Sequence, residues 1–76
     1  MKEMLLTELK EKQTAVVKDI RGGVGMVRRL EALGIRQGRK ITKISAHFWG
    51  GPVTVLVEKT KIAIGHGMAR KIVVEA

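Results

Sequence analysis

The chain has 76 residues, a net charge of +8 and no cysteine, which excludes a disulfide framework and a thiolate metal site. Its only aromatic residues are Phe48 and Trp49, too few for a platform on which successive nucleotide bases stack. Residues 1–76 are therefore expected to form a single small domain with an aliphatic core. The basic excess predicts attraction to an acidic partner. No apolar run approaches the roughly 20 residues of a membrane span, and the start is unlike a signal peptide, so a cytoplasmic protein is expected.

The N-terminal part of the chain predicts one main strand. Residues 14–20 are rich in β-branched side chains, which favours a strand. Val17 and Ile20 are three positions apart rather than two, so we expect a β-bulge between them. Before this strand, the leucines within residues 5–9 are expected to close one end of the core from a brief strand or turn.

A helix is predicted over residues 24–33, where the apolar period changes to 3.6 residues. Its core-facing side chains are expected to be Met26, Val27, Leu30 and Leu33. Arg28 and Glu31 point away from that face. Gly34 is expected to adopt the left-handed conformation after the last turn, with Ile35 folding back on the helix.

The rest of the chain predicts short strands separated by turns. These strands are expected over residues 40–48, 53–57, 62–64 and 72–75, with one helical turn at 68–71. In the first of them, alternation predicts a core-facing set made of Thr42, Ile44, Ala46 and Phe48. Five or six short strands with one short helix predict a mainly β fold, a small SH3-like barrel.

Residues 29–38 carry the most specific motif. They read Arg-Leu-Glu-Ala-Leu-Gly-Ile-Arg-Gln-Gly, which resembles the RLxxLGIxxG signature of the FeoA family of ferrous iron transport proteins. Other family features follow in order: a VxxI strand at residues 17–20, a Gly-Pro turn at 51–52 and a closing AxGxxxAxxIxV element at 63–74. The resemblance therefore covers almost the whole chain.

The resemblance implies an SH3-like barrel that works with FeoB, a membrane Fe²⁺ transporter with a cytoplasmic GTPase domain. The protein would be a cytoplasmic accessory subunit that binds and modulates the transporter. It would not be an enzyme, would hold no tightly bound cofactor and would contact Fe²⁺ only transiently. The alternative is a small basic barrel that binds RNA or DNA, against which stand the missing aromatic platform and the absence of a basic tail.

Candidate chemical sites in the chain are weak. Ser45 is the only serine and His47 lies two residues on, but no third partner completes a hydrolytic constellation. His47, His66 and a carboxylate such as Glu58 are the candidate metal ligands, yet neither histidine has a metal-binding spacing. We therefore favour two surface histidines over a metal centre. The glycine-rich residues 22–25 lack the lysine and hydroxyl residue of a phosphate-binding loop, which favours a simple turn.

Most of the net charge comes from one stretch of the chain. It holds Lys18, Arg21, Arg28, Arg29, Arg36, Arg39, Lys40 and Lys43. The acids Asp19 and Glu31 are the only ones between them. This pattern is typical either of a solvated face or of a docking face for an acidic partner.

The predicted partner-binding residues are Arg28, Arg29, Arg36 and Trp49. Trp49 follows Phe48 and precedes a Gly-Gly-Pro loop. Its ring is expected either to be an exposed binding hot spot or to fold over the end of the barrel as a plug. Phe48 is expected in the core.

Overall fold

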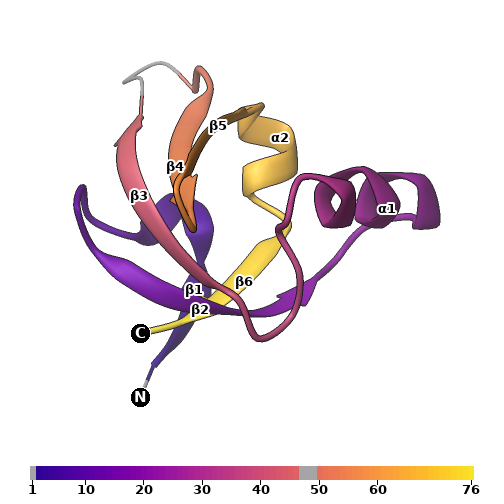
Figure 1. The fold of residues 1–76 in the computed structure, drawn as a ribbon, viewed down its shortest axis with the longest axis horizontal. Helices are drawn as coiled ribbons and strands as arrows, with labels where there is room; N and C mark the ends of the chain where they lie inside the picture. Colours follow the sequence, from indigo (N-terminus) through magenta and orange to yellow (C-terminus); the bar gives the residue numbers. More distant parts are fainter. Residues whose placement is uncertain (1, 47–49) are drawn as a thin grey trace.

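One antiparallel sheet of six strands, in the order β1-β6-β2-β3-β4-β5, organises the computed structural model, which describes residues 2–46 and 50–76. The elements are β1 (Glu3–Leu5), the 3-10 turn η1 (Leu6–Glu8), β2 (Thr14–Ile20), α1 (Val24–Ala32), β3 (Lys40–Ala46), β4 (Val53–Val57), β5 (Thr60–Ile64), α2 (His66–Ala69) and β6 (Ile72–Glu75). The sheet bends strongly, and α1 projects to one side of it (Figure 1). The predicted small, mainly β barrel is confirmed.

The two ends of the chain lie side by side (Figure 1). Main-chain hydrogen bonds join them: Lys2 N donates to Ala76 O at 2.9 Å, and Ala76 N donates to Lys2 O at 3.0 Å. The pairing of β1 with β6 therefore continues to Lys2 and Ala76.

The core is aliphatic, as the composition predicts. Its fully buried large side chains are Leu6, Leu30, Ile35, Ile41, Ile64, Ile72, Val17, Val53, Val55 and Val74. In β4 the alternation is regular, with Val53, Val55 and Val57 inward. Strand β5 begins at Thr60, two residues before the predicted start, because Val57 pairs with Thr60 across a turn of only two residues.

The predicted bulge in β2 is confirmed, since the pairing of β2 with β6 shifts register between Val17 and Asp19. A second shift, between Lys43 and Ser45 in β3, is not predicted from the sequence. Bulges insert one extra residue and re-aim the side chains that follow.

The predicted core-facing set of β3 is wrong before this second bulge. Ile41 and Lys43 are the buried residues, whereas Thr42 and Ile44 are only half-buried. The simple alternation failed because it treated Lys43 as a surface residue. The predicted set ended at Phe48, which lies outside the described residues.

Helix α1 matches the prediction closely and ends one residue earlier. Leu30 is fully buried, and Met26 and Val27 are half-buried against the core. Leu33 is 45% exposed, so it does not belong to the buried face. The last turn tightens around Leu33, whose N–H bonds to the carbonyl of Leu30, three residues back.

The end of α1 forms a Schellman motif. Gly34 has φ +93°, Ile35 N donates to Leu30 O at 2.9 Å and Gly34 N donates to Glu31 O at 3.0 Å. Ile35 is thereby turned into the core, where it is fully buried. This confirms the predicted roles of Gly34 and Ile35.

Candidate docking face

The three predicted docking arginines are exposed and lie on or beside α1. Arg28 and Arg29 project from the helix, and Arg36 follows in the loop that leads to β3. Among the described residues, the ion pairs are Lys18 with Glu75, and Arg39 with Glu58. The guanidinium groups of Arg28, Arg29 and Arg36 are therefore open to solvent or to a partner.

The basic stretch is less uniform than its sequence indicates. Lys43 is buried, and its Nζ donates hydrogen bonds to the carbonyl oxygens of Thr7 at 3.1 Å and Leu9 at 2.7 Å. Lys43 is thus a structural cation that connects η1 and the following Leu9 to β3. With Lys18 and Arg39 engaged by acids, Arg28, Arg29 and Arg36 remain as one exposed basic group on and beside α1, and other exposed lysines and arginines lie elsewhere on the surface.

The other candidate residues do not converge. Trp49, Phe48 and His47 lie outside the described residues. His66 begins α2 and is half-buried, while Glu58 is held by Arg39 across the sheet. Within residues 2–46 and 50–76, no three histidine or carboxylate side chains come together as a metal-ligand set.

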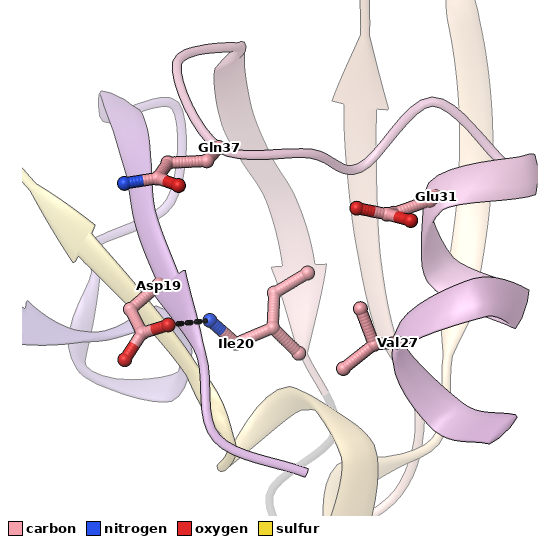
Figure 2. Close-up of a pocket in the computed structure, with 5 residues that line it drawn as sticks. All are labelled: Asp19, Ile20, Val27, Glu31 and Gln37. Carbon is pink, nitrogen blue, oxygen red and sulfur yellow. Dashed lines mark hydrogen bonds between the residues drawn. The ribbon is translucent and has the colours of Figure 1, made fainter. Parts of the chain in front are cut away.

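A hollow of about 110 Å³ opens between β2 and α1 (Figure 2). Ile20 and Val27 face each other across it, and Glu31 extends toward it from α1. Asp19 and Gln37 lie on the side of β2 and of the loop that follows α1 (Figure 2). The hollow therefore has an apolar floor and an acidic rim.

The carboxylates of this rim lack a cationic partner in the part of the chain that the structure describes. Asp19 Oδ1 accepts a hydrogen bond from Ile20 N at 2.8 Å, which fixes the side chain at the end of β2. Glu31 is exposed on α1, one turn after Val27.

The amino-acid sequence alone does not predict this hollow. The spacing of Val27 and Glu31 places both on one side of the helix, which is the one signal that the sequence carries. The contributions of Asp19, Ile20 and Gln37 depend on how the loop after α1 packs against β2, which local spacing does not reveal.

No helix in the described ranges is long and apolar enough to cross a membrane. Fold and exposed charge together define a class of protein: a small, basic SH3-like barrel with exposed arginines on and beside α1.

Comparisons with known proteins narrow this class. The family model described as FeoA domain matches residues 4–76. A protein of Methanocaldococcus jannaschii, provisionally named Fe(2+) transport protein A, is 41% identical over 66 residues, which are 87% of this chain and 78% of that protein. The chain belongs to the FeoA family.

Solved structures share the fold. A crystal structure of an iron uptake regulatory protein, FeoA, matches with a TM-score of 0.88 and 24% identity, covering 99% of this chain and 97% of the other. A manganese-dependent transcriptional repressor matches with a TM-score of 0.89 and 19% identity, covering 97% of this chain but 41% of the repressor. The same barrel thus also occurs as one part of a longer chain.

Proposed function

We propose that this protein is a cytoplasmic accessory subunit of ferrous iron uptake that binds and modulates a FeoB-type Fe²⁺ transporter. The observation that carries the proposal is the match of the FeoA domain model to residues 4–76. The name of the M. jannaschii relative points to the same process. We infer that the chain acts by binding rather than by chemistry of its own.

The proposed contact surface is the basic face around α1. Arg28, Arg29 and Arg36 are exposed and not engaged by the described acids. Guanidinium groups bind carboxylates through paired, planar hydrogen bonds, so an acidic patch on the transporter fits this face. Such charges at the rim of an interface mainly raise the association rate.

Fe²⁺ is the cargo of the proposed transporter, not a resident group of this chain. We propose that any contact of the chain with Fe²⁺ is transient. Metal analysis after anaerobic gel filtration of the Fe²⁺-treated protein tests this point. Retention of one equivalent of iron would contradict it.

The test of the main proposal uses the full chain and a detergent-solubilised FeoB-type transporter from the same organism. We expect saturable binding by biolayer interferometry and a changed rate of GTP hydrolysis by the transporter when the chain is added. Absence of both effects would overturn the proposal.

A separate binding experiment with nucleic acid tests the alternative function. Gel shifts with RNA and duplex DNA are run at low and high salt, because binding through phosphates weakens steeply as salt rises. Tight, salt-sensitive binding to nucleic acid without binding to the transporter would select the alternative. The repressor match at 19% identity concerns the fold alone and does not favour it.

A further inference from the structure

The hollow between β2 and α1 carries a charge opposite to that of the whole chain. The protein has 15 lysines and arginines against 7 acids, yet Asp19 and Glu31 both line this one hollow. Among residues 2–46 and 50–76, no lysine or arginine lines it. An incoming group that touches the rim therefore meets negative charge inside a basic surface.

Neither carboxylate is neutralised within the described residues. The ion pairs there are Lys18 with Glu75 and Arg39 with Glu58, and the nearby arginines Arg21, Arg28 and Arg36 are not paired with Asp19 or Glu31. The two exposed carboxylates at this place are therefore available to a cationic group of a partner.

Two carboxylates alone would not specify a ligand, but the apolar residues between them indicate which kind of ligand fits. Ile20 and Val27 are half-buried and face each other across the hollow (Figure 2). An apolar floor beneath a polar rim favours a side chain with a hydrocarbon stem and a charged end. A hydrated metal ion would gain nothing from Ile20 and Val27.

The size of the hollow sets a limit on the ligand. Pockets for small molecules and cofactors usually measure about 300–1,000 Å³. The hollow measures about 110 Å³, which suits one side chain and not a nucleotide or metabolite.

We propose that the hollow receives one arginine side chain of a partner protein. Its methylene groups lie over Ile20 and Val27, and its guanidinium group donates hydrogen bonds to Glu31 or Asp19 and to the amide oxygen of Gln37. Arginine fits better than lysine because its planar group is less strongly hydrated and offers more donors.

The surrounding charge defines the rest of the epitope. An isolated arginine would be repelled by a chain of net charge +8, so the inserted side chain must be flanked by acidic residues. Those acids face exposed arginines such as Arg28 and Arg36. The partner therefore presents an acid–arginine–acid segment. Only the identity of that partner rests on the proposed function.

Two short peptides test the inference without the transporter. The probe is acetyl-Glu-Arg-Glu-amide, and its control replaces arginine by citrulline, which has nearly the same shape but no charge. Binding is followed by NMR through the amide signals of Ile20, Val27 and Gln37. General attraction to a basic protein favours the more negative citrulline peptide, whereas the hollow favours the arginine peptide.

We expect the arginine peptide to bind about two- to five-fold more tightly, the ratio for one solvent-accessible ion pair. Glu31→Gln should abolish this preference, although the substitution makes the protein more basic. Glu11→Gln is the matched control, because Glu11 is exposed, lines none of the hollows described and changes the net charge equally.

Equal binding of the two peptides, tighter binding of the citrulline peptide or absence of binding at millimolar peptide would each overturn the inference. Retention of the arginine preference in Glu31→Gln would do the same. The transporter takes no part in these titrations, so their failure leaves the proposed function standing. Conversely, failure of transporter binding leaves the peptide result intact.

Discussion

Lys43 is a cation inside an aliphatic core. Its hydrocarbon stem is packed in the barrel, and its Nζ reaches the carbonyl oxygens of Thr7 and Leu9. Main-chain contacts at the same residue, from Lys12 N to Lys43 O and from Lys43 N to Gln13 O, hold the same segment. The side chain of Lys43 therefore adds to the main-chain contacts that hold η1 and the residues after it against β3.

Replacing Lys43 with methionine tests this role. Lys43→Met keeps most of the stem but leaves two buried carbonyl groups without their donor. We expect the free energy of unfolding to fall by about 1–3 kcal/mol in urea denaturation. Lys40→Met, on the exposed side of the same strand, should change it by less than about 0.5 kcal/mol. Equal effects of the two substitutions would contradict the role given to Lys43.

Lys43 also shows what residue-level reasoning misses. Alternation along β3 assigned the inward phase to Thr42 and Ile44, because a lysine in a strand is normally a surface residue. The true inward pair is Ile41 and Lys43. Only the distant carbonyl groups of η1 and Leu9 make that burial favourable, and no local pattern contains them.

At the scale of elements, α1 is attached to the barrel by few contacts. Leu30 is its one fully buried side chain, with Met26 and Val27 packed partly against the core. Figure 1 shows the rest of the helix projecting from the sheet. The proposed docking face is therefore held in place mainly by Leu30 and by the turn that ends the helix.

Two leucine truncations on α1 separate anchoring from surface contact. Leu30→Ala should lower the free energy of unfolding by about 2–5 kcal/mol, because it opens a cavity beneath the helix. Leu33→Ala makes the same chemical change at a side chain that is 45% exposed, and its cost should be below about 1 kcal/mol. Thermal denaturation of both variants measures the difference. Similar losses would show that Leu30 is not the anchor.

Two glycines of the same region should respond to alanine with opposite signs. Gly34 has φ +93°, where a Cβ is strained, so Gly34→Ala should cost about 1–2 kcal/mol of unfolding free energy. Gly25 lies within α1 with open space at its Cβ position, so Gly25→Ala should stabilise by about 0.5–1 kcal/mol. Urea denaturation gives both values. A loss at Gly25 would show that the first turn of α1 needs glycine.

Elements were more predictable than the hollow between them. The bulge in β2, the helix α1 and the glycine that ends it each depend on a few consecutive residues, so local patterns predicted them. The hollow joins Asp19 and Ile20 to Gln37, which lies 18 and 17 positions further along the chain, and the buried Ile35 holds the loop after α1 against the barrel. Tertiary packing of this kind leaves little trace in local spacing.

At the scale of the whole molecule, exposed basic residues occur along the whole chain, and the arginines beside α1 form one group among them. Ion pairs and burial remove Lys18, Arg39 and Lys43 from the free surface, while Arg28 and Arg36 remain exposed beside α1. A net charge of +8 attracts any acidic partner, and we expect the arginines beside α1 to orient the encounter. Orientation is a property that net charge alone does not give.

The double variant Arg28→Glu with Arg36→Glu tests this orientation. Its association rate with the FeoB-type transporter at low salt should fall about ten-fold or more, with little change in folding stability. At about 1 M salt, where charges are screened beyond roughly 3 Å, the difference from the unmodified chain should nearly vanish. The matched control is Lys2→Glu with Lys10→Glu, which removes equal charge at a hollow beside β1. If docking is oriented by α1, the control slows association much less at low salt; equal slowing by both pairs would mean that only the total charge matters.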